Sequence, residues 1–140
     1  MKVIIAGSRT FNDYEFLKSE CTRIIVEAQW KYGISNSEIE IVSGGAKGAD
    51  LLGEQFAKEF GLPVKRFPAN WKDMTPPCIP AHNQFGTYNK LVGMNRNQKM
   101  AEYVHENGGF LIAFNCWTNG ILDMMKRARL LGIKVYEESL

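Results

Sequence analysis

Short apolar runs alternate along the chain with stretches in which apolar residues recur at helical spacing. The apolar runs predict five strands, at residues 2–6, 40–43, 64–68, 110–114 and 134–137. Helices are predicted after Asn12 or Asp13, from the glycine-rich turn at residues 44–48 to Gly61, over about residues 88–106, and from Gly120 to Gly132. This alternation predicts an α/β fold, a doubly wound sandwich with a mainly parallel five-strand sheet, whose last strand lies at an edge.

The first predicted helix carries its apolar residues on one face: Leu17, Cys21, Ile24, Ile25 and Ala28. Residues 71–86 show no such periodicity and contain three prolines, so they are predicted to form one long loop. Loops of this length inside a compact domain are commonly lids or binding loops.

Composition narrows the class of protein. The 140 residues carry 17 Lys and Arg against 15 Asp and Glu, a size and balance that fit one globular domain covering residues 1–140. No apolar run approaches the roughly 20 residues of a membrane span, and Gly7 ends the first run too early for a secretory signal. Cys21, Cys78 and Cys116 are far apart and odd in number, which indicates reduced thiols. We therefore expect a cytoplasmic protein with no membrane contact.

Three loops that leave strand ends have unusual composition: residues 7–10, 43–50 and 115–120. In a parallel sheet they emerge at one edge, where ligands bind. Ser43, Gly44, Gly45, Lys47 and Gly48 are candidates for a phosphate cradle, or for a tight turn with close helix packing. A Walker A loop and a GxGxxG fingerprint are both excluded by spacing, and no metal-ligand spacing occurs, so we expect no cofactor and no metal.

Further candidates surround the same edge. Arg9 is a candidate phosphate ligand or a surface ion-pair partner, and Asp50 either occupies the first helical turn or faces a ribose hydroxyl. Arg96 and Asn97 either point into the cleft or form a solvated first turn. Trp71, just after the third strand, and Trp117 either stack on a base or cap the core.

Taken together, these motifs carry a family resemblance. Gly7-Ser8-Arg9, the SGGAKGAD run from Ser43 to Asp50, the FPANW run from Phe67 to Trp71, the GMNRNQKM run from Gly93 to Met100, and Leu111 to Phe114 occur in this order. In them the chain resembles the SLOG superfamily and, more closely, its YspA, or cpYpsA-related, branch. The resemblance implies a Rossmann-like fold that binds nucleotides or nucleotide-derived ligands. More distant relatives are the Lonely Guy phosphoribohydrolases, which cut the base from a nucleoside monophosphate, and the DNA-processing protein A family, which binds single-stranded DNA.

Departures from the hydrolase pattern limit what carries over. The hydrolases have a PGGxGTxxE loop with a catalytic Glu; here Gly120 matches, Ile121 replaces the Thr, and Met124 stands where the Glu would be. Asp123 is one position away, a turn of about 100° around a helix. Arg96 does match the hydrolase arginine. If the protein is an enzyme, its catalytic residues are therefore expected among Arg96, Asp50 and Asp123.

The function expected from these residues is binding of a nucleotide-derived small molecule, such as an ADP-ribose-like signal, in a sensor or signalling module. Its binding residues would be Gly7, Ser8, Arg9, Ser43, Gly44, Gly45, Lys47, Gly48, Asp50, Trp71, Arg96, Asn97, Trp117, Thr118 and Gly120. The alternative is an N-glycosidic hydrolase of nucleoside monophosphates. The near-neutral net charge of +2 counts against single-stranded nucleic acid as a partner. The resemblance also implies a homodimer, with the third helix as its candidate surface.

Overall fold

The computed structural model describes residues 1–139. Its elements are β1 (Lys2–Gly7), α1 (Tyr14–Tyr32), a 3-10 turn (Asn36–Glu38), β2 (Glu40–Ser43), α2 (Ala49–Glu59), β3 (Val64–Arg66), β4 (Pro80–Asn83), β5 (Gly86–Asn89), α3 (Val92–Asn107), β6 (Gly109–Phe114), α4 (Asn119–Leu130) and β7 (Lys134–Glu138). Within this range no helix is long and apolar enough to cross a membrane.

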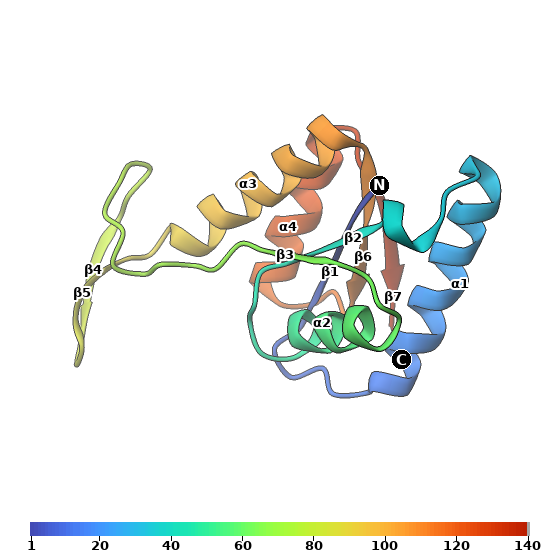
Figure 1. Ribbon diagram of the computed structural model, residues 1–140. Helices are drawn as coiled ribbons and strands as arrows, with labels where there is room; N and C mark the ends of the chain where they lie inside the picture. The colour runs from blue at the N-terminus through green and yellow to red at the C-terminus, as the bar shows by residue number, and fades with distance from the viewer. Residues whose placement is uncertain (140) are drawn as a thin grey trace.

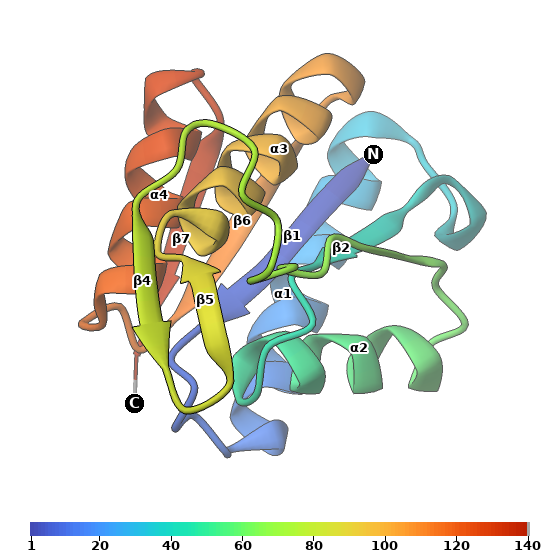
Figure 2. The same cartoon turned by 90° about the vertical axis from the view of Figure 1, so that its left-hand side faces the viewer.

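A five-strand parallel sheet forms the centre, in the order β3–β2–β1–β6–β7 (Figures 1 and 2). This confirms the predicted sheet and the edge position of the last strand. The chain first builds outward from β1 to β3 and then returns to place β6 on the other side of β1. The strand order therefore reverses between β1 and β6, and in such folds ligands bind beyond the carboxyl ends of the strands at this point.

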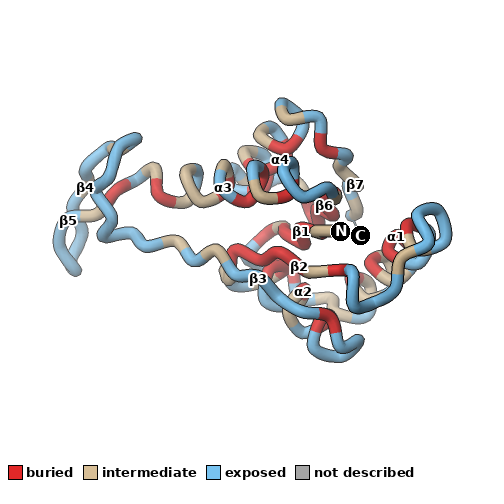
Figure 3. Tube along the Cα trace, turned by 45° about the horizontal axis from the view of Figure 1, so that its top comes forward, coloured by how far each residue is buried: buried red, intermediate tan, exposed pale blue. Residues whose placement is uncertain are grey.

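Helices cover both faces of the sheet, and alternate residues of β1 serve the two layers. Val3 and Ile5 pack with the buried faces of α1 and α2, whereas Ile4 and Ala6 pack with α3 and α4. This alternation follows from the two-residue period of a strand. The buried stretches of β1, β2 and β6 lie between the helical layers in Figure 3.

The predicted start of α1 and its predicted inner face are confirmed. Asp13 is the N-cap, and its carboxylate accepts a hydrogen bond from the Phe16 N–H at 3.0 Å. At the other end Gly33 adopts a left-handed conformation with φ 65°, which glycine allows without strain. The five residues predicted on its inner face are the five that are buried.

The segment after β3 differs from the prediction. Instead of one loop over residues 71–86 and a helix from residue 88, the chain forms an antiparallel hairpin of β4 and β5, and α3 begins only at Val92. We call residues 79–90 the arm, because it projects from the sandwich beyond the start of α3 (Figure 1). The prediction missed it because its strands have four residues each and lack alternation of apolar and polar side chains. β3 also ends earlier than predicted, at Arg66, so Trp71 lies on a turn beyond it.

Candidate functional site

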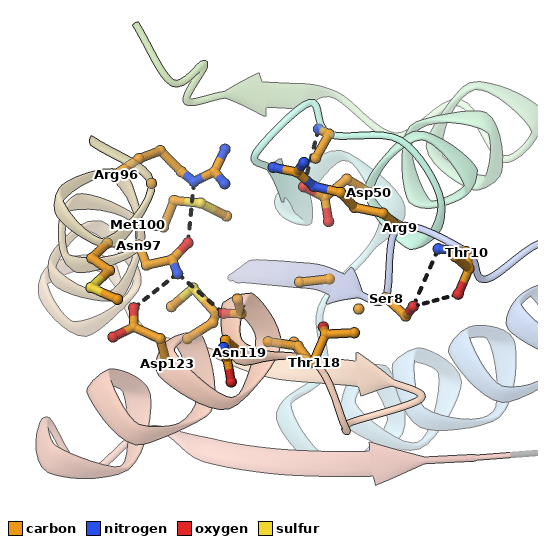
Figure 4. A pocket seen from close by; sticks show the side chains of 18 of the residues that line it. Ser8, Arg9, Thr10, Asp50, Arg96, Asn97, Met100, Thr118, Asn119 and Asp123 are labelled. Carbon is orange, nitrogen blue, oxygen red and sulfur yellow. Dashed lines mark hydrogen bonds between the residues drawn. The ribbon is translucent and has the colours of Figure 1, made fainter. Parts of the chain in front are cut away.

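A cavity of about 320 Å³ opens where β1 and β6 end. Its wall comes from the loop after β1, the start of α2, the first half of α3 and the first turn of α4 (Figure 4). Ten of the predicted residues line it: Gly7, Ser8, Arg9, Asp50, Trp71, Arg96, Asn97, Thr118, Gly120 and Asp123. Segments far apart in the sequence thus meet at the point of strand-order reversal.

Arg96 extends from α3 into the wall of this cavity. Its Nη1 donates to the carbonyl oxygen of Gly44 at 2.7 Å, and its Nε donates to Oδ1 of Asn97 at 3.1 Å. The guanidinium is largely withdrawn from solvent, and burial, with a smaller contribution from the nearby Arg9, lowers its pKa. These contacts orient the fork and leave Nη2 as a donor for an anionic ligand.

Asp50 is the buried acid of the cavity. It lies in the first turn of α2, where its Oδ2 accepts the Ala46 N–H at 3.2 Å. Burial raises its pKa to about 6, although this hydrogen bond and the charges of Arg96 and Arg9 favour the carboxylate. Figure 4 shows the side chain of Arg9 lying beside Asp50, whereas Arg96 enters from α3. The cavity therefore holds a titratable carboxyl group between two cations.

Asn97 joins α3 to α4 below the cavity. Its Nδ2 donates to Oδ2 of Asp123 at 3.0 Å and to the carbonyl oxygen of Gly120 at 3.3 Å. Asp123 also accepts from Nε of Arg127 at 2.9 Å. Asp123 is thus held in an ion pair within α4, so Asp50 is the better placed of the two candidate catalytic carboxylates.

The start of α4 lines the cavity with Thr118, Asn119 and Gly120. Thr118 is its N-cap, and among the described residues no side chain caps this end. The exposed N–H groups and the positive end of the helix dipole favour an anion. Across the cavity, Ser8 is buried, and its Oγ lies 2.8 Å from Oγ1 of Thr10.

The glycine-rich loop uses several of its own polar groups. The N–H of Gly45 donates to Oγ of Ser43 at 3.0 Å, and Oγ of Ser43 donates to Oε2 of Glu54 at 2.6 Å. Gly44, Gly45 and Lys47 line an adjoining pocket that shares Arg9, Ala46, Trp71 and Arg96 with the cavity. The remaining predicted residues, Ser43, Gly48 and Trp117, do not line the cavity.

Gly48 has a packing role. Its φ is 81°, and a β-carbon at this position would lie 2.3 Å from the carbonyl oxygen of Ser8. The α2 turn is therefore pressed against the loop after β1, which brings Asp50 toward Arg9. Trp117, in contrast, is 62% exposed.

Several lining residues were missed by the sequence analysis: Thr10, Ala46, Lys90, Gly93, Met94, Met100, Asn119, Ile121 and Met124. Thr10 and Asn119 belong to loops that had been singled out, so a wider selection there would have included them. Lys90 is the last residue of the unrecognised arm, and Met94 lies in the first turn of α3, within the quoted run from Gly93 to Met100. Over residues 1–139, no three His, Cys, Asp or Glu side chains are grouped so that they could hold a metal ion.

Comparison with known proteins identifies relatives of this site's fold. The family model described as "YspA, cpYpsA-related SLOG family" matches residues 1–73. The X-ray structure of DNA processing protein A (DprA) from Streptococcus pneumoniae superposes with a TM-score of 0.66 at 20% sequence identity, covering 97% of this chain and 49% of that one. The chain thus spans about half of that protein, and at this identity the likeness shows the fold. No curated protein matches the sequence.

Proposed function

The chain belongs to the YspA, cpYpsA-related SLOG family, and on that premise we propose that it binds a nucleotide or nucleotide-derived ligand, of an ADP-ribose-like kind, in the cavity between β1 and β6. The observation that carries this proposal is the placement of Arg9, Arg96 and the uncapped start of α4 around one cavity. These groups favour phosphate, because two guanidiniums and a helix N-terminus all present donors and positive charge.

The cavity also offers groups that suit a nucleoside. Trp71 offers an aromatic face for a base, and Asp50 offers carboxylate oxygens that accept hydrogen bonds from ribose hydroxyls. We propose that the protein works in the cytoplasm, which its three free cysteines fit. The homodimer implied by the resemblance stays a prediction, which light scattering on the eluted protein tests.

Thermal shift and calorimetry with AMP, ADP, ADP-ribose, adenosine and a single-stranded oligonucleotide test the proposal. We expect phosphorylated nucleosides to raise the melting temperature and adenosine to have little effect. Arg9→Ala and Arg96→Ala should each weaken binding by about 10- to 100-fold, the size of a charged hydrogen bond. Arg129→Ala removes the same charge at the far end of α4 and should leave binding unchanged.

The proposal is contradicted if no nucleotide stabilises the protein. It is equally contradicted if both cavity variants bind as Arg129→Ala does. A preference for the oligonucleotide over every mononucleotide would instead favour nucleic acid, the class suggested by the name of the structurally similar DNA processing protein A.

A second candidate function, N-glycosidic hydrolysis of a nucleoside monophosphate, is favoured by one observation. A buried carboxyl group with pKa about 6 faces the cavity beside Arg96, and a carboxylate there can activate water or stabilise positive charge on the sugar. If the protein hydrolyses AMP, Asp50→Asn should abolish release of adenine, measured by chromatography. Asp123→Asn should retain most of it, since Asp123 is held by Arg127 and Asn97.

A further inference from the structure

We propose that Asn89 is a positioning residue that holds Trp71 at the cavity and thereby gives the site its preference for ligands that carry a base. The inference rests on the proposed function and names a residue to which neither the sequence nor the comparisons give a role. It concerns the base of the arm, where β5 ends and the chain turns into α3.

The side chain of Asn89 is fully buried and completely hydrogen-bonded. Its Oδ1 accepts the N–H groups of Ile79 at 3.1 Å and Leu91 at 2.9 Å. Its Nδ2 donates to the carbonyl oxygens of Asp73 at 3.1 Å and Pro77 at 3.2 Å. An amide side chain has two donor hydrogens and one carbonyl oxygen with two acceptor sites, so all of its capacity is used. One residue thus ties together the segment before the arm, the arm itself and the start of α3.

The backbone of Asn89 fixes Trp71 directly. The Asn89 N–H donates to the carbonyl oxygen of Trp71 at 2.8 Å, and the next N–H, of Lys90, donates to the carbonyl oxygen of Ile79 at 2.9 Å. Trp71 and Lys90, both of which line the cavity, are therefore positioned by the same cluster of hydrogen bonds around Asn89.

The indole of Trp71 is packed between two residues that lie on either side of Asn89 in the sequence. The ring of Tyr88 meets it edge-on, with centroids 6.4 Å apart and an interplanar angle of 75°. A β-carbon on Gly93 would lie 3.3 Å from Cη2 of Trp71, so the missing side chain at Gly93 makes room for the ring on the first turn of α3. Trp71 remains 39% exposed, which leaves part of its surface open to a ligand.

The hydrogen bonds around Asn89 are needed because few other contacts hold the arm to the sandwich. A two-stranded hairpin is marginally stable by itself in water, and most residues of this one are exposed (Figure 3). Among the described residues, the two hydrophobic core clusters contain none from positions 71–91. Loosening Asn89 should therefore release Trp71 while the sandwich, with Arg9 and Arg96, stays folded.

The chemistry of the ligand follows from what each part of the cavity offers. Phosphate interacts with the arginines and the start of α4, whereas an aromatic base gains from stacking on the indole. AMP and ribose 5-phosphate separate these contributions, because both carry the phosphate and only AMP carries a base.

The test compares Asn89→Asp with Asn83→Asp, measuring calorimetric affinity for AMP and for ribose 5-phosphate. Asn89→Asp keeps the size of the side chain and replaces both N–H donors by a charged oxygen. Asn83→Asp makes the same change in the arm's exposed turn, where Oδ1 of Asn83 only accepts the Phe85 N–H. We expect Asn89→Asp to weaken AMP binding roughly fivefold or more, the range of one base–aromatic stack, without changing the affinity for ribose 5-phosphate. Asn83→Asp should change neither.

A second readout needs no ligand. In a chain with Trp30→Phe and Trp117→Phe, both at exposed positions, Trp71 is the remaining tryptophan, and excitation at wavelengths that tyrosine does not absorb selects its emission over that of tyrosine. Asn89→Asp should shift its emission to the red and increase quenching by acrylamide. Should Asn89→Asp fail to fold, Trp71→Leu in the otherwise natural chain should give the same selective loss of AMP.

Equal losses for AMP and ribose 5-phosphate would overturn the proposal, as would unchanged Trp71 emission or retention of full AMP affinity by Trp71→Leu. Failure of the proposed function looks different: neither probe would bind the natural protein. In that case the proposed preference for a base is also wrong. The fluorescence measurement still decides whether Asn89 positions Trp71.

Discussion

Replacement of Gly7 by valine is expected to destabilise the fold by about 3 kcal/mol or more, a large part of the 5–15 kcal/mol of a typical domain. A β-carbon at Gly7 would lie 2.3 Å from the carbonyl oxygen of Phe114 and 2.8 Å from Cβ of Ala49. Gly7 is the register partner of Phe114 in the central strand pair, so the backbone there cannot move aside without breaking the ladder. Denaturant unfolding followed by circular dichroism measures the loss.

Gly120→Ala is the matched control, since Gly120 was predicted as a ligand residue on the same grounds. Gly120 lies in the first turn of α4. Apart from its two chain neighbours and the nearby backbone of its own helix, no heavy atom of the described residues lies within 4 Å of a β-carbon placed there. Alanine favours helices over glycine, so stability should stay the same or rise slightly. Similar stability of Gly7→Val and Gly120→Ala would contradict this assignment of Gly7 to packing.

The sheet and its helices could be predicted because their buried residues follow local patterns. Leu17, Cys21 and Ile24 recur at helical spacing in α1, and the buried runs of β1 and β6 are continuously apolar because helices cover both faces. Such patterns need only neighbouring residues to be read.

The arm could not be predicted in this way. Its strands carry polar residues such as His82 and Thr87. Their arrangement depends on Asn89, whose side chain forms hydrogen bonds with four residues in three segments. Those contacts are tertiary, and a lone asparagine between strand and helix has no sequence signature that distinguishes it from a surface residue.

The candidate site was predictable in position more than in detail. Loops from parallel strands meet at one edge, so Arg9 and Asp50 were expected together. For Arg96 the sequence left two alternatives, a place in the cleft or a solvated first turn, and in the structure all three residues line one cavity. The phosphate cradle expected at Ser43 to Gly48 depends on which N–H groups are free. Oγ of Ser43 and Oδ2 of Asp50 accept two of them, and the Ser43 hydroxyl is oriented by Glu54 from the next turns of α2. Glycine spacing does not reveal such partners.

Asp50→Asn should change how stability depends on pH. Burial raises the Asp50 pKa from 3.8 to about 6, so the folded protein holds this proton more tightly than the unfolded chain does. Deprotonation of Asp50 therefore lowers the free energy of unfolding as the pH rises from 3.8 to about 6. Asparagine does not titrate and has no such effect. The free energy of unfolding of Asp50→Asn minus that of the natural protein should rise by about 2 to 3 kcal/mol between pH 4 and pH 7, and level off above it.

Two further variants test the cause of this rise. The charge of Arg96 lowers the Asp50 pKa. In an Arg96→Ala background, the difference in free energy of unfolding caused by Asp50→Asn should therefore continue to rise to higher pH. Asp73→Asn is the control of opposite sign, because hydrogen bonds from Thr75 lower the pKa of the exposed Asp73. The Asp73 carboxylate stabilises the fold, and this effect is lost as the pH falls. The free energy of unfolding of Asp73→Asn minus that of the natural protein should therefore not rise between pH 4 and pH 7. A flat difference for Asp50→Asn across that range would mean that the Asp50 carboxyl is charged throughout and that Arg9 and Arg96 outweigh its burial.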